Sequence, residues 1–257
     1  MALGSREEHL RMMPPSDAQR VAAQQPNGNR PEVMHQRWES LLFLHWRFPP
    51  ARIQETLPSG LCVDTFDGDA YLGIVPFYMR NVRPVTIPAV PWISFFLELN
   101  VRTYVFDRRG VPGVWFYSLD CNQPLAVLIA RALTGLRYYH AAMSATGGDF
   151  IDYSCRRRGT TDVARYRYRG FGEARESGPG SLEFFLLERY YLFARRGGSL
   201  VRGQVAHTPY RYRDAEVDAW STTPAQLDGF SEMAKAPTHT CFVDGFKVKI
   251  YATEKIS

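Results

Sequence analysis

The sequence predicts an α+β fold in which a mainly antiparallel sheet curls around an interior, with one helix of several turns beside it. Short apolar or alternating runs recur from Trp38 onward, and glycines and prolines separate them, which is typical of strands joined by turns. One segment, from Gln123 to about Thr134, has the length and end signals of a helix. Neither a repeat nor a linker divides the 257 residues, and β-rich units of this length are common as single domains.

The first 33 residues differ in composition from the rest. They are rich in Gln, Pro, Asn and Arg without an apolar period, so residues 1–33 are predicted to be a disordered tail and residues 34–257 a single domain. The start of the chain lacks the apolar core of a secretory signal, and no run approaches the roughly 20 apolar residues of a membrane span. The four cysteines are too far apart for a disulfide framework, so we expect a protein of the reducing cytoplasm.

The first half of the domain is predicted to consist of strands with one short helix. LLFLHWRF (41–48) alternates between two sides and predicts a strand, and Pro50 opens a short helix that ends near Pro58. LCVDTFDGDAYLGIVPF (61–77) predicts a hairpin, because Asp67-Gly68 suits the type I′ turn that joins antiparallel strands. Two further strands are predicted at 95–106 and 113–120.

The helix that starts at Gln123 carries signals at both ends. Asn122 or Asp120 can cap its first turn, Pro124 stands where proline is tolerated, and Gly135 can supply the stop. Later strands are predicted at 150–156, 163–169, 182–195, 199–207 and 240–252, and a short helix after Pro224.

The strand at 95–106 has one apolar side and one mixed side. The apolar side comprises Phe95, Leu97, Leu99, Val101 and Val105, and the mixed side Phe96, Glu98, Asn100, Arg102, Tyr104 and Phe106. Exposure to solvent alone would account for the charges, whereas aromatics interleaved with an acid and a guanidinium are typical of a lined cavity. In a cavity, loss of solvent would raise the pKa of Glu98 and Arg102 would lower it. The sequence leaves both interpretations open.

A second polar group stands at the end of the predicted helix, in ARALTGLRYYHAAM (130–143), where Arg131 lies on the helix and Arg137, Tyr138, Tyr139 and His140 follow. This run, with TLPSGLCVD, DGDAYLGIVPFYM, FFLELNVRTYV and SLDCNQPLAVLIARALTG, resembles the bacterial YqjF-like family, whose members resemble acetoacetate decarboxylase in fold. LEFFLLERYYLF and GQVAHTPY extend the resemblance over about residues 35–215.

The resemblance implies an acetoacetate decarboxylase-like fold, a curled sheet or barrel that encloses a pocket. Phe96-x-Glu98 is similar to the Tyr-x-Glu strand of the decarboxylases, whose acid faces the pocket. Arg131 matches the arginine of their Arg-Glu pair, while the adjacent glutamate is replaced by Ala132. Their Pro-Lys-Lys run matches 137–139, where both lysines are replaced by tyrosine. Because a tyrosine cannot form a Schiff base, the resemblance implies the pocket without the decarboxylase activity.

Lysine is scarce in this chain. Four of the 31 basic residues are lysines, at 235, 247, 249 and 255, so residues 1–234 contain none. Arginine stays protonated and cannot serve as an amine nucleophile. We therefore expect no Schiff-base chemistry.

These observations favour a small-molecule site, lyase- or isomerase-like if catalytic, that acts on a small carbonyl or carboxylate compound without cofactor or metal. The candidate catalytic residues are Glu98, Tyr138 and His140, and the candidate substrate-binding residues are Arg102, Arg131, Tyr104, Tyr139 and Asn100. Arginine can hold a carboxylate, a phenol can donate to a carbonyl or enolate oxygen, and Glu or His can move a proton. The alternative is a non-catalytic ligand-binding or assembly protein of the same fold, and self-association stays open.

Other polar residues are expected to have structural roles. Glu188 lies amid apolar residues and is expected to pair with an arginine, in the core or at the pocket rim, because an unpaired buried charge is costly. His45 and His207 are expected to be structural, and His239 with Cys241 gives too few ligands for a metal site.

CRRRGTTDVARYRYRG (155–170) contains six arginines and one acid. A basic stripe beside aromatics can bind nucleic acid, but on a strand Arg165, Arg167 and Arg169 would face away from Tyr166 and Tyr168. A solvated ribbon or a subunit contact is the favoured interpretation, and nucleic-acid contact through 156–169 is the weaker alternative.

Overall fold

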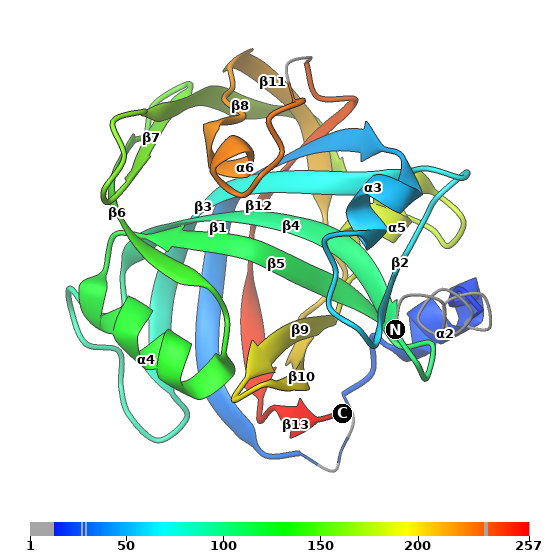
Figure 1. Cartoon of the computed structure of the whole chain (residues 1–257). Coiled ribbons are helices and arrows are strands. Elements are labelled where there is room, and N and C mark those ends of the chain that lie inside the picture. The colour runs from blue at the N-terminus through cyan, green and yellow to red at the C-terminus, as the bar shows by residue number, and fades with distance from the viewer. Residues whose placement is uncertain (1–12, 27, 29, 234–235, 257) are drawn as a thin grey trace.

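The computed structural model describes residues 13–26, 28, 30–233 and 236–256, without the side chains of 129–133 (Figure 1). The helices are α2 (Asp17–Ala22), α3 (Pro50–Gln54), α4 (Pro124–Thr134), α5 (Leu182–Leu187) and α6 (Thr223–Leu227). The strands are β1 (Glu32–Phe48), β2 (Leu61–Val63), β3 (Ala70–Pro84), β4 (Phe96–Asp107), β5 (Pro112–Cys121), β6 (Tyr138–Thr146), β7 (Ile151–Arg157), β8 (Ala164–Arg175), β9 (Tyr191–Arg196), β10 (Ser199–Ala206), β11 (Tyr212–Ala219), β12 (His239–Tyr251) and β13 (Glu254–Lys255). The predicted α+β class, with mainly antiparallel strands, is confirmed.

The strands belong to one 13-stranded sheet, in the order β13-β10-β9-β5-β6-β7-β8-β11-β12-β1-β3-β4-β2. Two additional pairings, β5–β4 and β10–β12, bring distant strands of this order together, so hydrogen-bonded neighbours run in a ring β5-β4-β3-β1-β12-β10-β9. The β5–β9 and β10–β12 contacts comprise only two residue pairs each, so the sheet is curled and is not a regular barrel. Figure 1 shows β6, β7, β8 and β11 arching past one side of the long strands.

The long central strands are buried on both sides, because apolar residues pack against each of them. On one side β1 contributes Leu42 and Leu44 to a core that includes Tyr166 of the arch. On the other side β1 contributes Leu41 and Phe43 to a second core, which includes Val75, Phe77, Phe96 and Phe246. Every residue of β4 is buried. A polar side chain on β4 must therefore find its partners inside the protein.

The strand predicted at 182–195 is wrong in its first half. Residues Leu182–Leu187 form helix α5, and β9 begins only at Tyr191. The Ser181 hydroxyl accepts a hydrogen bond from the Phe184 N–H (3.2 Å) and so caps the helix. The run is apolar enough to match a buried strand, and the serine cap is the signal that distinguishes the two structures.

The hairpin predicted at 61–77 is confirmed only at its turn. Asp67 and Gly68 both have positive φ (50° and 83°), as a type I′ turn requires, and an isolated bridge joins Phe66 to Asp69. The strands on either side do not pair with each other, because β2 pairs with β4 instead. Three strands, β6, β11 and the two-residue β13, were not predicted, and the charged sequence YRDAEVDA explains why β11 escapes an apolar pattern.

The prediction of a disordered tail over 1–33 is wrong for the residues that the structure describes, and residues 1–12 lie outside them. Ser16 and Gln19 form a capping box at the start of α2. Arg20 of α2 is buried and donates two hydrogen bonds to Asp64, at 2.5 and 2.8 Å. Arg189 donates to the same carboxylate at 2.7 Å. The amino-terminal helix is therefore anchored by a buried charge cluster.

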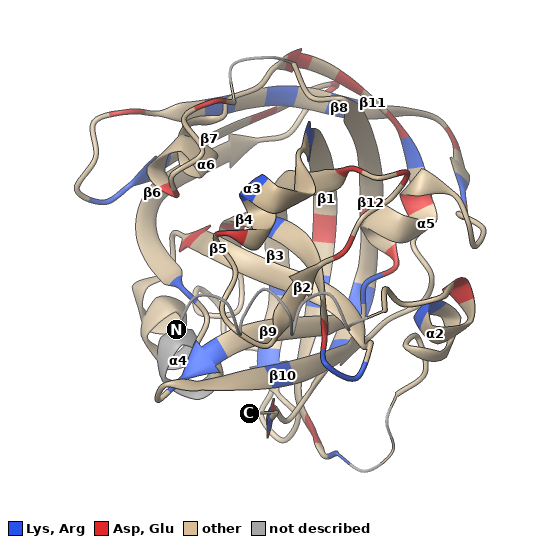
Figure 2. Cartoon of the chain, turned by 45° about the vertical axis from the view of Figure 1, so that its right-hand side comes forward, with Lys and Arg blue, Asp and Glu red and all other residues tan. Residues whose placement is uncertain are grey.

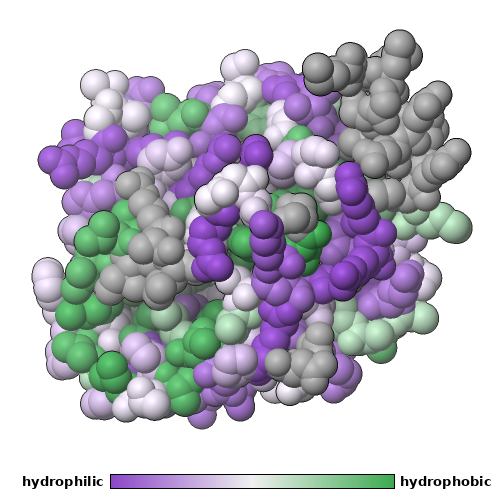
Figure 3. Space-filling model, turned by 60° about the horizontal axis from the view of Figure 1, so that its bottom comes forward, coloured by the Kyte–Doolittle hydropathy of each residue, from purple (hydrophilic) through white to green (hydrophobic). Residues whose placement is uncertain are grey.

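Exposed hydrophobic side chains gather on the side of the molecule where α4 and the 85–95 connection lie, seen in green at the left of Figure 3. Trp92 (73% exposed), Leu128 and Phe95 are among them. Apolar patches of this kind are typical of protein contact surfaces. No helix in the described parts of the chain is long and apolar enough to cross a membrane.

Removal of the Asp64 charge should destabilise the fold strongly. In Asp64→Asn the Arg189 guanidinium stays buried without an anionic partner, and Arg20 keeps only a 3.9 Å contact with the exposed Asp17. We therefore expect a loss of about 3–5 kcal/mol in unfolding free energy, measured by urea denaturation. Asp69→Asn, which removes an exposed 3.6 Å contact to Arg47, is the control and should cost less than about 1 kcal/mol. Equal losses in the two variants would contradict this account.

Candidate functional site

The candidate site is a row of polar side chains on β4. Glu98, Asn100, Arg102 and Tyr104 alternate along the strand on the side of Phe96, which faces the second core. Each of the four is at most 6% exposed. The interpretation that this side faces solvent is therefore wrong, and the row lies inside the curled sheet.

Glu98 is a carboxylic acid held neutral by its surroundings. Burial raises its pKa to about 8, although a hydrogen bond from the Tyr138 hydroxyl (3.1 Å) lowers it in part. Burial and the nearby Glu98 carboxyl raise the pKa of Tyr138 well above its usual value. At neutral pH this pair can donate protons to a ligand oxygen, and Glu98 is close enough to ionisation to exchange one.

A glycine turn brings Tyr138 to Glu98. Gly135 follows α4 with φ of 74°, and a Cβ atom there would lie 2.4 Å from the carbonyl oxygen of Arg195. Only glycine fits both conditions. The chain can therefore turn sharply from α4 into β6, which begins at Tyr138 and runs parallel to β5.

Arg102 is a buried cation without an anionic partner among the described residues. Its Nη2 donates to the Tyr104 hydroxyl and to the Leu186 carbonyl, both at 3.4 Å, and its Nε has no partner. The guanidinium lies 5.1 Å from the centre of the Phe43 ring. Nearby, the Asn100 side-chain oxygen is also buried without a partner. Buried groups of this kind are costly unless something binds them.

Two histidines extend the row, and the sequence did not predict that they meet. His45 is fully buried on β1, and its Nε2 lies 2.7 Å from the Tyr104 hydroxyl. Its Nδ1 lies 2.9 Å from Nδ1 of His239, whose own Nε2 is 3.8 Å from Glu183. Burial lowers the pKa of both histidines. His45 and His239 are 194 positions apart in the sequence, so no local pattern connects them.

Two predicted site residues, Tyr139 and His140, do not join Glu98 in the described part of the chain. Tyr139 lies on the opposite side of the sheet, where its ring is 4.3 Å from the Arg157 guanidinium, and the prediction that it lines the same site is wrong. His140 is two strands from Glu98, through Cys121, and no hydrogen bond joins the two described side chains. The side chain of Arg131 lies outside the described residues.

A separate buried cluster surrounds Arg157. Its guanidinium donates to Asp120 (2.8 and 2.9 Å) and to Asp228 (3.0 Å), and it contacts Ser118 at 2.7 Å. Both carboxylates are therefore matched by charge-assisted bonds inside the protein. The cluster connects β5, β7 and the end of α6, which is a structural role.

Two arginines on the exposed side of the 156–169 ribbon, Arg167 and Arg169, are paired with acids. Arg167 contacts Asp152 and Asp218 at 2.6 and 3.3 Å, and Arg169 contacts Asp149 and Glu216 at 2.5 and 2.7 Å. Acidic and basic residues accordingly lie side by side on β8 and β11 at the top of Figure 2. This pairing neutralises two of the three arginines of the stripe and counts against nucleic-acid contact.

Glu188 has different partners from those expected. Its carboxylate accepts a hydrogen bond from the Tyr210 N–H (2.8 Å) and another from the Tyr190 hydroxyl, and no arginine contacts it among the described residues. Burial raises its pKa. The predicted arginine pairing is therefore wrong, because a phenol and a backbone amide satisfy the acid. The His207 ring stacks on Tyr190, as a structural role predicts.

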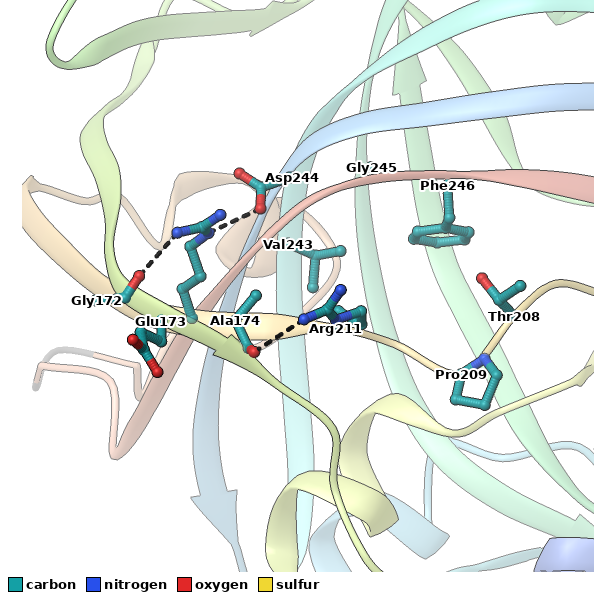
Figure 4. A pocket seen from close by; sticks show the side chains of 11 residues that line it. Gly172, Glu173, Ala174, Thr208, Pro209, Arg211, Val243, Asp244, Gly245 and Phe246 are labelled. Atoms are coloured by element: carbon teal, nitrogen blue, oxygen red, sulfur yellow. Dashed lines mark hydrogen bonds and ion pairs between the residues drawn. The ribbon is translucent and has the colours of Figure 1, made fainter.

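A cavity of about 590 Å³ is lined by residues of β8, β11 and β12 and by Thr208 and Pro209, and Glu98 is not in its wall (Figure 4). The cavity lies along one edge of β12, between the pairings of that edge with β11 (242–243) and β10 (249–250), while the other edge pairs with β1. Phe246 and Thr208 are in its wall. The Phe246 ring packs on Tyr210 (4.6 Å between centroids), and Tyr210 packs on Phe43 (5.9 Å). The rings of Phe246, Tyr210 and Phe43 thus connect the cavity wall with Arg102.

No described lysine reaches the interior. Lys247, Lys249 and Lys255 are exposed, and Lys235 lies outside the described residues. Lys249 forms an ion pair with Glu32 at the surface (2.9 Å).

Residues 35–247 match a family described as an uncharacterized conserved protein, DUF2071. The chain is 34% identical over 213 residues to the uncharacterized protein YqjF of Bacillus subtilis (strain 168), across 81% of this chain and 88% of that protein. The resemblance inferred from the sequence motifs is confirmed.

Solved structures establish the fold. An acetoacetate decarboxylase-like enzyme from Sphingomonas wittichii RW1 is similar with a TM-score of 0.60 at 16% identity, over 88% of this chain and 94% of that one. The enduracididine biosynthesis enzyme MppR complexed with pyruvate gives 0.61 at 14% identity, over 88% and 91%. An acetoacetate decarboxylase gives 0.61 at 12% identity, over 98% and 97%. The fold is acetoacetate decarboxylase-like, as predicted.

The raised pKa of Glu98 should make stability depend on pH. Between about pH 5 and pH 8 the unfolded state ionises this acid, whose ordinary pKa is 4.5, while the folded state, in which its pKa is about 8, keeps it protonated. The unfolded state then binds fewer protons, so unfolding free energy should fall as pH rises, by up to about 1.4 kcal/mol per pH unit. Glu98→Gln should remove this slope in urea denaturation series.

Glu55→Gln, at an exposed acid, is the matched control and should keep the slope of the parent. A parent and a Glu98→Gln variant with parallel pH curves would show that the acid is ionised in the folded protein.

Proposed function

The chain belongs to the DUF2071 family, and from that premise we propose that it binds a small carboxylate or 2-oxo acid at the buried guanidinium of Arg102. The observation that carries the proposal is the lack of an anionic partner for Arg102 among the described residues. Its two hydrogen bonds to neutral oxygens are long (3.4 Å), and its Nε is unpartnered. A ligand carboxylate would supply the missing charge and accept two parallel N–H bonds.

The charge balance around Arg102 supports an anionic ligand. Arg20 and Arg189 share the single carboxylate of Asp64, and the Arg189 guanidinium lies 5.2 Å from the Tyr104 ring, which Arg102 also approaches (5.7 Å). Three guanidinium groups, those of Arg20, Arg102 and Arg189, therefore lie near the one buried carboxylate of Asp64, which leaves an excess of positive charge inside the protein. Such an excess attracts an anion into a site of low dielectric constant.

We propose that Glu98 and Tyr138 act on the ligand carbonyl. A neutral acid and a phenol can donate hydrogen bonds to a carbonyl oxygen and to the enolate that forms when a neighbouring proton is removed. The Asn100 oxygen, which lacks a partner, can accept a hydrogen bond from the ligand. These roles give proton-transfer chemistry of the lyase or isomerase type. The pyruvate named in the MppR complex is a 2-oxo acid of this class, bound by a protein of the same fold.

A non-catalytic binder would use the same site. In the family resemblance Tyr138 and Tyr139 occupy the positions of the two lysines, one of which forms the Schiff base. Every described lysine is exposed, which favours binding or proton transfer over covalent catalysis. In either case we propose that a ligand reaches the site from the cavity at Phe246, by displacement of the Tyr210 and Phe246 rings.

Replacement of Arg102 should separate ligand binding from stability. Small carboxylates and 2-oxo acids, pyruvate first, should raise the melting temperature of the parent, with about 2.7 kcal/mol of stabilisation at 100 times Kd. Arg102→Gln should weaken binding by at least about tenfold, because a bidentate charged bond is lost. The unliganded variant should be as stable as the parent or more so, since an unpaired buried charge is removed.

The control is Arg165→Gln, at an exposed arginine of β8, which should bind the ligand as the parent does. Binding that is unchanged in Arg102→Gln would place the ligand elsewhere.

Reductive trapping should find no covalent amine intermediate. Incubation with pyruvate and borohydride should leave the intact mass of the protein equal to that of a sample treated with borohydride alone, because no described lysine lies near Arg102. Peptide mapping of the four lysine positions completes the measurement. An adduct on any one lysine that requires Arg102 would overturn the assignment of non-covalent chemistry.

A further inference from the structure

A continuous row of polar groups leads from Arg102 to the protein surface. The Arg102 Nη2 lies 3.4 Å from the Tyr104 hydroxyl, which lies 2.7 Å from Nε2 of His45. Nδ1 of His45 is 2.9 Å from Nδ1 of His239, and Nε2 of His239 is 3.8 Å from the Glu183 carboxylate. His45 and Tyr104 are fully buried, whereas the Glu183 side chain is 29% exposed. The row therefore connects the interior with solvent.

The positions of the protons in this row follow from the donors available. Arg102 can only donate, so the Tyr104 oxygen accepts from it. The Tyr104 hydroxyl then donates its proton to Nε2 of His45, because no other acceptor contacts it among the described residues. Neutral His45 consequently carries its proton on Nδ1 and donates it to Nδ1 of His239. His239 is left with its proton on Nε2, which faces Glu183.

Every donor in this arrangement points outward. The opposite arrangement, with His45 protonated on Nε2, would leave the buried Tyr104 hydroxyl proton without an acceptor. Burial favours the neutral form of both histidines, as a row of single-proton donors requires. Gly73 on β3 makes room for the row, because a Cβ atom there would lie 3.2 Å from the His45 ring and 3.5 Å from the Arg102 side chain.

We propose that Tyr104, His45 and His239 form a relay that carries a proton between a ligand held by Arg102 and the surface acid Glu183. This inference rests on the proposed function, and it adds the base and the route by which the proton leaves. Within the relay, Tyr104 is the residue that contacts the ligand. The two histidines position the Tyr104 hydroxyl and pass the proton on to Glu183.

The relay balances in each direction. On the way out, a ligand C–H bond adjacent to the carbonyl breaks and its proton bonds to the Tyr104 oxygen, while the electron pair passes to the carbonyl oxygen as an enolate. Tyr104 gives its former proton to Nε2 of His45, His45 gives the Nδ1 proton to His239, and His239 gives the Nε2 proton to Glu183, with a water able to bridge the 3.8 Å step. Both histidines end neutral, with their protons on the other nitrogen.

The row is then set for the reverse transfer. A proton from solvent enters at Glu183, passes through His239 and His45 to Tyr104, and bonds to carbon as the enolate electron pair returns. Each histidine regains its first tautomer, so the cycle closes without an oxidant or any other reactant. Because the returning proton comes from solvent, the ligand should exchange its hydrogen with water.

The experiment measures deuterium incorporation into pyruvate in heavy water by proton NMR, with the full-length chain. The parent should exchange the methyl hydrogens catalytically. His239→Ala should slow exchange by at least about tenfold with Kd unchanged, and added imidazole should restore much of the rate, which a purely structural role would not allow. Glu183→Gln, a mild change in the first turn of α5, should also slow exchange. His35→Ala, on β1 outside the row, is the control.

A second measurement needs no ligand. Nitrogen-15 NMR of the histidines should show His45 protonated on Nδ1 and His239 on Nε2. The opposite tautomers, or a His239→Ala variant that binds pyruvate and exchanges it at the rate of the parent, would overturn the relay. If no tested carboxylate binds the parent, the proposed function is wrong and the relay fails with it, whereas a ligand that binds but exchanges independently of His239 overturns the relay alone.

Discussion

The burial of both sides of β4 is the constraint on which the rest of this structure depends. A strand covered on one side only could leave Glu98 and Arg102 in water, where they would need no explanation. Here neither group can reach water, because every residue of β4 is buried. A buried polar group must be neutral, hydrogen-bonded or satisfied by a ligand. Glu98 is neutralised by its raised pKa, Tyr104 is hydrogen-bonded, and Arg102 is left unmatched.

Two polar clusters on opposite sides of the sheet differ in how completely their charged groups are satisfied. Around Arg157 each charge has a partner, and the distances of 2.7–3.0 Å leave nothing unsatisfied. Around Arg102 the bonds are long, and donors and acceptors remain without partners. Natural proteins rarely leave such groups buried without a use for them. This contrast, more than the residue types, distinguishes the two clusters.

The sequence predicts what depends on local order and misses what depends on distant contacts. Alternation along 95–106 locates the polar row, and the Asp67-Gly68 pair locates a turn. The strand partner of β2 and the contact between His45 and His239 depend on how the sheet closes, which no local pattern records. Apolar runs are ambiguous between helix and strand, and α5 was assigned wrongly for that reason. Tyr139 was misplaced because adjacent strand residues face opposite sides.

The docking of α2 through Arg20 has a practical side. Composition alone would recommend trimming the chain to begin at Met34, where a regular apolar pattern starts. A truncated protein of that kind would lack one of the two guanidinium groups that hold Asp64, and would uncover the Phe185 ring that Arg20 now covers at 5.1 Å. Recombinant samples made for crystallisation should accordingly keep residues 13–33, since a shortened version would report on an altered interior.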